Sequence, residues 1–191
     1  SNSTFLNSND VGGGDGILFY SQGGPTTGTI SNNTVSGNAR VGIRILAKSV
    51  GSITVTSSNN SILNNGSYGL VLTDEGGSSA LASSYTASNN TIIGNGGGVA
   101  AGVRRFGIGT RSTIVTTTIE DNLILNNTAV GVRIGLSNSS TPTFESMAGD
   151  CGGEGVNQGP QPIHPFTIAD NTIVGNSGGA IATCHKPGGT Y

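Results

Sequence analysis

Short segments in which apolar and polar residues alternate recur along the whole chain. In Ile43-Arg44-Ile45, two apolar residues flank a polar one, which is the period of two expected for a β-strand with one buried face. None of these segments shows the apolar period near 3.6 that predicts an amphipathic helix. The pattern therefore predicts an all-β protein built from short strands.

One six-residue phrase recurs and defines a repeat. Asn33-Thr34-Val35-Ser36-Gly37-Asn38 returns with changes at 60–65, 90–95, 122–127 and 171–176, and residues 3–8 are a weaker first copy. The apolar residues at its third position form one aligned column: Phe5, Val35, Ile62, Ile92, Ile124 and Ile173. They are separated by 30, 27, 30, 32 and 49 residues. The chain is thus predicted to contain a structural repeat with loops of variable length.

Two further strands are expected in each repeat. A second alternating segment follows the phrase, at 42–45, 69–72, 102–105, 131–134 and 179–182, and a third precedes the next copy, at 52–56, 113–117 and 165–169. Three short strands per repeat describe one turn of a solenoid. We therefore expect about six coils in a single domain over residues 1–191, with a long loop insertion at about 135–165.

The residues at the expected corners suit sharp changes of direction. Paired Asn, or Asp followed by Asn, lies between the third strand and the next phrase, and Asn tolerates a left-handed backbone. Stacked amides can also bond to one another, which predicts a ladder of corner side chains: Asn33, Asn60, Asn90, Asn122 and Asn171. Gly is expected to supply positive φ at the second corner.

Composition supports this narrow architecture. Only 9% of residues are charged and 5% aromatic, Gly occurs 33 times and Trp is absent, so large side chains are too few for a wide core. The net charge of -2 and the lack of a Lys/Arg run argue against a nucleic-acid partner. No apolar stretch has the length of a membrane span.

Two kinds of residue indicate an extracellular or cell-surface location. Cys151 and Cys184 flank the last coil, and we expect them to form a disulfide that holds the long loop, since such bonds persist in oxidising compartments. Several Asn-X-Ser/Thr sequons occur. Those that recur at the corner are explained by the backbone, which leaves Asn2, Asn65 and Asn138 as glycosylation candidates.

These phrases resemble the right-handed parallel β-helix repeat of the pectin-lyase-like superfamily over nearly the whole chain. The phrases at 173–181 and 5–8 also look like short motifs of bacterial surface adhesins and autotransporter passengers. The resemblance implies a right-handed parallel β-helix. Many relatives act on polysaccharides, but the Asn-Thr-Asp, Asp-Asp, Gly-His-Gly and Arg-Ile-Lys motifs of polygalacturonase-like members do not occur here.

We accordingly expect no catalytic residues, metal ligands or cofactor. The acidic residues are scattered, and His164 and His185 have no carboxylate at a clear spacing. The favoured interpretation is a structural or adhesive β-helix module outside the cell. A polysaccharide-active enzyme (lyase, hydrolase or epimerase) and a carbohydrate-binding β-helix are the alternatives.

Three arginines are the candidate ligand-binding residues. Arg44, Arg104 and Arg133 are expected at the outward position of the second strand in coils two, four and five. Stacking would place them in a stripe about 14 Å long, and guanidinium groups suit the carboxylates or sulfates of an acidic glycan. The alternative is that these arginines only keep an exposed strand face soluble.

The two ends of the predicted solenoid expose strand edges. The first phrase begins at Ser3, and coil six runs through Ile181 into a short Gly-rich tail, so neither end has a recognisable cap. Uncapped strand edges recruit other strands. We therefore expect both ends to be covered by further coils of a longer chain or by other copies stacked head to tail.

Overall fold

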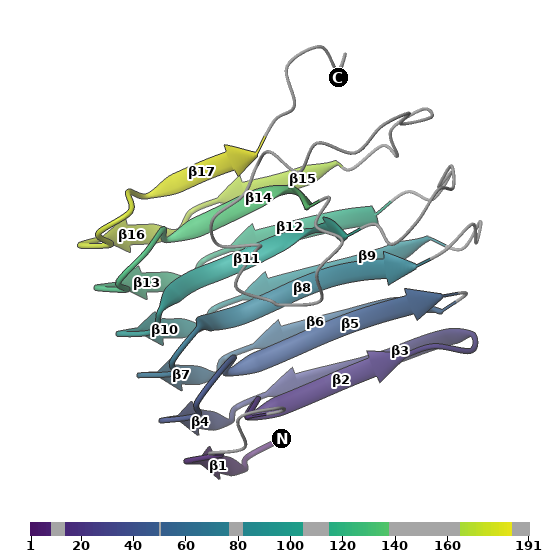
Figure 1. The fold of residues 1–191 in the computed structure, drawn as a ribbon, viewed down its shortest axis with the longest axis horizontal. Coiled ribbons are helices and arrows are strands. Elements are labelled where there is room, and N and C mark those ends of the chain that lie inside the picture. Colours follow the sequence, from purple (N-terminus) through teal and green to yellow (C-terminus); the bar gives the residue numbers. More distant parts are fainter. Residues whose placement is uncertain (9–13, 50, 77–81, 105–114, 138–164, 185–191) are drawn as a thin grey trace.

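The computed structural model describes residues 1–8, 14–49, 51–76, 82–104, 115–137 and 165–184 (Figure 1). These residues form strands joined by tight corners, and no helix occurs among them. The strands lie in three parallel sheets. The prediction of an all-β chain with three strands per repeat is confirmed.

Each sheet collects one strand from every repeat. The six short strands of sheet A are β1 (Thr4–Leu6), β4 (Thr34–Ser36), β7 (Ser61–Leu63), β10 (Thr91–Ile93), β13 (Leu123–Leu125) and β16 (Thr172–Val174). The six of sheet B are β2 (Ile17–Ser21), β5 (Ile43–Ser49), β8 (Tyr68–Gly76), β11 (Gly97–Arg104), β14 (Val132–Ser137) and β17 (Ile181–Cys184). The five of sheet C are β3 (Pro25–Ser31), β6 (Ser52–Ser58), β9 (Ser83–Ser88), β12 (Val115–Glu120) and β15 (Phe166–Ala169).

The chain visits the sheets in the order A, B, C and then returns to A one level higher. This produces five coils of three strands and a sixth in which two strands are described, with β1 at one end of the stack and β16 and β17 at the other (Figure 1). The expected column is confirmed, since Phe5 pairs with Val35 and each later member with the next. The register persists across the longest interval, where Ile124 pairs with Ile173.

The interior between the sheets is one narrow apolar core. Alternate strand residues point inward from all three sheets and form a single cluster that runs from Ile30 in the first coil to Ile134 in the fifth. Tyr85 crosses this core from sheet C, and its hydroxyl donates to the Thr73 carbonyl oxygen at 2.9 Å. A core of this width needs few large side chains, which agrees with the composition.

The corner between sheets C and A has the predicted geometry. The first residue of each pair has positive φ, between 53° and 58°: Asn2, Asn32, Asn59, Asn89, Asp121 and Asp170. The second residue points inward and forms the predicted first amide ladder, in which each Nδ2 donates to the Oδ1 one coil further along at 2.9 to 3.0 Å: Asn33, Asn60, Asn90, Asn122 and Asn171.

A second amide ladder, which sequence analysis missed, lies at the corner between sheets A and B. Its side-chain hydrogen bonds are 2.7 to 3.1 Å long and join Asn38, Asn65, Asn95, Asn127 and Asn176. The same residues had been identified as the last position of the repeated phrase. The two ladders therefore flank sheet A on both sides.

Glycine at this second corner has two separate roles. Positive φ occurs at Gly37, Gly94 and Gly175, with values of 67° to 70°, as predicted. The glycines at or just before the start of the sheet B strands are needed for space instead. A Cβ at Gly42 would lie 2.5 Å from Ile62 Cγ2 and 2.7 Å from the Gly69 carbonyl oxygen, and a Cβ at Gly69 would meet Ile92 and Asn95 in the same way.

Candidate functional site

The outer face of sheet B carries the arginines that were expected to form a binding stripe. The structure places one outward column across its six strands, in the order Leu18, Arg44, Val71, Ala100, Arg133 and Ala182. Arg44 and Arg133 therefore share a column, as predicted. Their Cα atoms are separated by three strand spacings, about 14 Å.

Arg104 does not belong to this column, and its predicted position is wrong. It pairs with Ser137, whereas the residue level with Arg133 is Ala100, four residues earlier. The prediction aligned Gly102 with Gly131, but the glycine that occupies the equivalent close contact is Gly98. The segment from Gly97 to Gly102 contains only Gly, Ala and Val, so its weak apolar pattern did not reveal where the strand begins.

The gap between the two arginines is not an open surface. Val71 and Ala100 are 0% and 1% exposed, and they form a small buried cluster with Val41 and Tyr68. The Tyr68 hydroxyl is buried and has no hydrogen-bond partner among the described residues. A ligand lying along the column would find an apolar, covered section between Arg44 and Arg133, and the column does not contain the three stacked arginines that were predicted.

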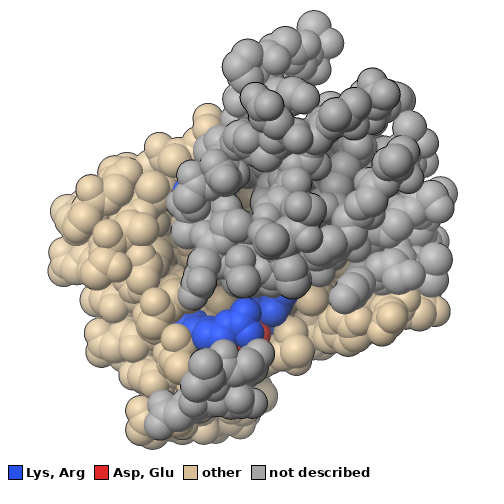
Figure 2. Space-filling model, viewed as in Figure 1, with Lys and Arg blue, Asp and Glu red and all other residues tan. Residues whose placement is uncertain are grey.

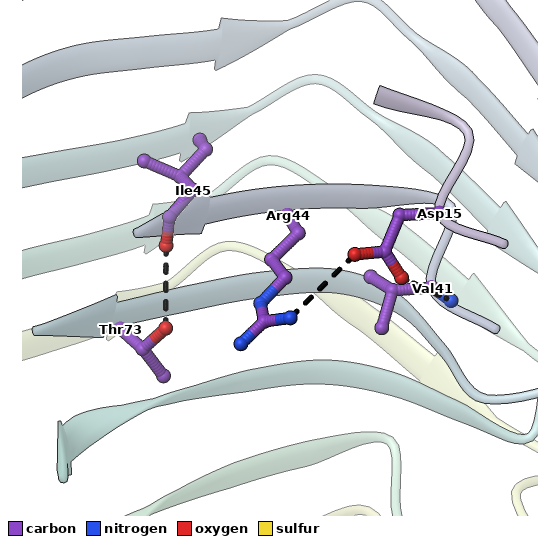
Figure 3. Close-up of polar contacts among 5 residues, drawn as sticks. All are labelled: Asp15, Val41, Arg44, Ile45 and Thr73. Atoms are coloured by element: carbon purple, nitrogen blue, oxygen red, sulfur yellow. Dashed lines mark hydrogen bonds and ion pairs between the residues drawn. The ribbon is translucent and has the colours of Figure 1, made fainter. Parts of the chain in front are cut away.

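Arg44 is engaged in an ion pair instead. Its Nη1 lies 3.6 Å from Asp15 Oδ2, and the two side chains are only 13% and 6% exposed (Figure 3). The other carboxylate oxygen of Asp15 accepts a hydrogen bond from the Val41 backbone N–H at 3.3 Å. Asp15 precedes β2 in the first coil, while Arg44 is in β5 of the second. The pair therefore connects two successive coils.

On the face viewed in Figure 2, Lys and Arg atoms form one band with an acidic atom directly beside it. Most of the remaining described surface on this face is uncharged. Asp15 offsets the charge of Arg44, and this contact competes with any external carboxylate or sulfate. The arrangement is therefore better suited to fastening coils together than to holding an acidic glycan.

The predicted glycosylation candidates have different outcomes. Asn65 is 2% exposed, and its Nδ2 donates to Asn95 Oδ1 at 2.8 Å and to the Val35 carbonyl oxygen at 3.2 Å. A glycan on that nitrogen would break the second amide ladder, so the structure excludes Asn65 as a glycosylated residue of the folded coil. Asn2 is exposed and occupies the same left-handed corner as Asn32, so the backbone explanation applies to it as well. Asn138 lies outside the described residues.

The predicted disulfide and the long insertion fall largely outside the described residues. Cys184 is the last residue of β17, but Cys151, His164, His185 and the insertion from 138 to 164 are not described. Within the described ranges, no three His, Cys, Asp or Glu residues cluster closely enough to hold a metal ion. The same ranges contain no helix that is long and apolar enough to cross a membrane.

The stacked parallel sheets around one core define the protein as a parallel β-helix solenoid. The chain matches the family described as right handed beta helix region over residues 1–189, and it belongs to that family. The predicted fold class is therefore confirmed, and it is consistent with the resemblance to the pectin-lyase-like superfamily. Comparison with curated proteins and with solved structures gave no match.

Proposed function

We propose that this chain is an extracellular structural or adhesive β-helix module whose stack of coils is a rigid scaffold and whose ends join to other copies. The observation that carries the proposal is the apolar core, which reaches the first and the last described coils. Phe5 in the first coil is 37% exposed, and Phe166 and Ile181 at the far end are 44% and 50% exposed.

Core residues at both ends have one covered side and one exposed side. Phe5 and Ile173 are the two terminal members of the sheet A column whose inner members, such as Ile62 and Ile92, are completely buried. Covering apolar surface is favourable at about 25 cal/mol per Å². The terminal strands also offer unpaired backbone groups to another strand. Another coil of the same kind supplies both the apolar contact and the backbone hydrogen bonds.

The extracellular location is part of the proposal. It rests on the two cysteines and on the low share of charged residues, 9% of the whole chain. Disulfides persist in oxidising compartments. Mass spectrometry of material purified from its native source tests this part: a Cys151–Cys184 bond supports it, and two free thiols contradict it.

Light scattering and electron microscopy of the purified 191-residue chain test the assembly. We expect rods that lengthen with protein concentration, because a contact between two different ends propagates. Charge introduced at an end should prevent this growth, so the variants are Phe5→Lys and Ile181→Lys. The matched control is Leu123→Lys, because Leu123 is 36% exposed on the lateral face of sheet A rather than at an end. A monodisperse monomer at high concentration would refute the proposal.

A further inference from the structure

The two amide ladders have a direction. In each, the backbone N–H and the side-chain Nδ2 of one Asn both donate to the Oδ1 of the Asn in the following coil, as Asn60 does to Asn90 at 3.0 Å and Asn65 to Asn95 at 3.0 and 2.8 Å. Donors therefore face the C-terminal end of the stack and acceptors face the N-terminal end. The ends are chemically different.

Both ladders change residue type in the first coil. Serine occupies the two ladder positions there: the Ser3 backbone N–H donates to Asn33 Oδ1 at 3.1 Å, and that of Ser8 donates to Asn38 Oδ1 at 3.0 Å. A serine hydroxyl can still accept a hydrogen bond from a preceding coil. The N-terminal face thus carries two hydroxyl acceptors, one on each side of β1.

The last described coil presents the complementary groups. The Nδ2 groups of Asn171 and Asn176 donate to the carbonyl oxygens of Ile119 and Ile124 at 2.8 and 3.1 Å, and also to those of Ala169 and Val174 at 2.7 and 3.3 Å. The donors that face a following coil are therefore their backbone N–H groups, whose equivalents in Asn122 and Asn127 donate to the next Oδ1. In the described part of the chain no later Asn accepts from them as Asn171 accepts from Asn122. Donors on one face and hydroxyls on the other favour head-to-tail contact. Two C-terminal ends would place donor against donor, so their hydrogen-bonding groups would not match.

The position just before each residue of the second ladder fixes the register between stacked coils. Its residues are left-handed and alternate between Asn and Gly from coil to coil: Asn7, Gly37, Asn64, Gly94, Asn126 and Gly175. A Cβ on each of these glycines would overlap the Oδ1 of the Asn in the preceding coil. An Asn at this position must therefore be followed by Gly. In the described coils the alternation runs from Asn7 to Gly175, so coil one of a second copy placed on coil six would put Asn7 after Gly175, just as Asn126 follows Gly94.

The geometry points to a specific partner for the first and last described coils, namely a second copy of this chain stacked head to tail. In the junction, coil six of one copy lies against coil one of the next, with Gly175 opposite Asn7 and Ile173 opposite Phe5. The backbone N–H groups of Asn171 and Asn176 then donate to the hydroxyls of Ser3 and Ser8. This inference rests on the end-to-end assembly proposed above and adds its polarity and its register.

Exchanging Asn and Gly across the last two coils tests the register. In the double variant Asn126→Gly/Gly175→Asn, every Asn at this corner within one chain is still followed by Gly or ends the series, but Asn at 175 now faces Asn7 of the next copy. We expect assembly to be lost while circular dichroism and the urea midpoint show a folded chain. Adding Asn7→Gly should restore assembly, and Asn7→Gly alone should leave it intact. Restoration by the third substitution excludes misfolding as the cause.

Replacing the two serines of the first coil by Asn extends both ladders and tests the polarity of the head-to-tail junction. Ser3→Asn/Ser8→Asn gives each terminal amide an Oδ1 acceptor, and we expect the critical concentration for assembly to fall about tenfold, as for about one additional net hydrogen bond. Ser84→Asn on the lateral face of sheet C is the control and should leave that concentration unchanged.

The results separate the two proposals. A wild-type chain that stays monomeric refutes the proposed function. Wild-type rods that persist unchanged in the folded double variant and in Ser3→Asn/Ser8→Asn refute the register and polarity and leave the proposed function standing. Assembly that stops at dimers refutes the head-to-tail junction, because identical ends would then have met. If the double variant does not fold, the critical concentration of Ser3→Asn/Ser8→Asn tests the junction instead: a fall supports it, and an unchanged value refutes it.

Discussion

Neighbouring asparagines at the corner between sheets C and A have different roles. Asn89 is exposed, with φ of 54°, and its value to the fold is tolerance of the left-handed backbone. Asn90 is 1% exposed, accepts from Asn60, and donates to Asn122 Oδ1 and to the Ser57 carbonyl oxygen. One residue sets the direction of the chain, and the next connects three coils.

Substituting each of these two residues by Gly separates the roles. Asn89→Gly should change the free energy of unfolding by less than about 0.5 kcal/mol, because Gly adopts positive φ without strain. Asn90→Gly should lower it by about 2 to 5 kcal/mol, because buried donors and acceptors lose their partners. Urea unfolding followed by circular dichroism measures both. Equal losses would show that the ladder adds nothing beyond the corner geometry.

At the scale of elements, the contact between coils one and two depends on more than strand pairing. β2 and β5 are parallel neighbours, and the ion pair between Arg44 and Asp15 lies beside them. Both side chains are largely shielded from solvent. A shielded pair resists screening by salt, and losing one member leaves the other charge uncompensated.

A double-mutant cycle with Arg44→Met and Asp15→Asn measures this contact. We expect a coupling energy of about 1 to 2 kcal/mol from urea unfolding, because each substitution removes the attraction while Asn at 15 still accepts from Val41. The control cycle combines Asp15→Asn with Arg133→Met, three strands further along. Its coupling should be below about 0.5 kcal/mol. A coupling near zero in the first cycle would mean that the pair does not stabilise the first coil.

At the scale of the whole molecule, stability depends on position in the stack. Every inner coil is covered by a neighbour on each side, whereas the first and last described coils are covered on one side. In such solenoids the free energy of folding is approximately a sum over coils and their contacts. Equivalent residues of one column should therefore contribute unequally to the free energy of unfolding, with more from inner coils than from end coils.

Ile92→Ala and Ile173→Ala test this dependence within a single column. Ile92 is completely buried, and its loss should lower the free energy of unfolding by about 2 to 5 kcal/mol. Ile173 is partly buried at the end of the stack, so its loss should cost less than about 2 kcal/mol. The measurement uses urea unfolding in the non-assembling Phe5→Lys background. A cost at Ile173 as large as at Ile92 would show that this end is already covered.

The sequence by itself determined the repeat, the three-strand coil, the aligned column from Phe5 to Ile173 and the first amide ladder. These features depend on local properties: a period of two buries one face of a strand, and Asn accepts a left-handed corner wherever it occurs. They recur in nearly every repeat, so one weak copy, such as residues 3–8, did not obscure them. A repeated local signal is sufficient for the architecture of a solenoid.

Only the tertiary structure decided how neighbouring coils meet. It placed Ala100 rather than Arg104 level with Arg133, buried Asn65 inside the second amide ladder, and brought Asp15 against Arg44. Each of these contacts joins residues 27 to 33 positions apart. Their pairing depends on the length of the intervening loops, which varies from coil to coil. The sequence pattern shows which segments are strands, but which residues pair between strands of neighbouring coils is set by packing in three dimensions.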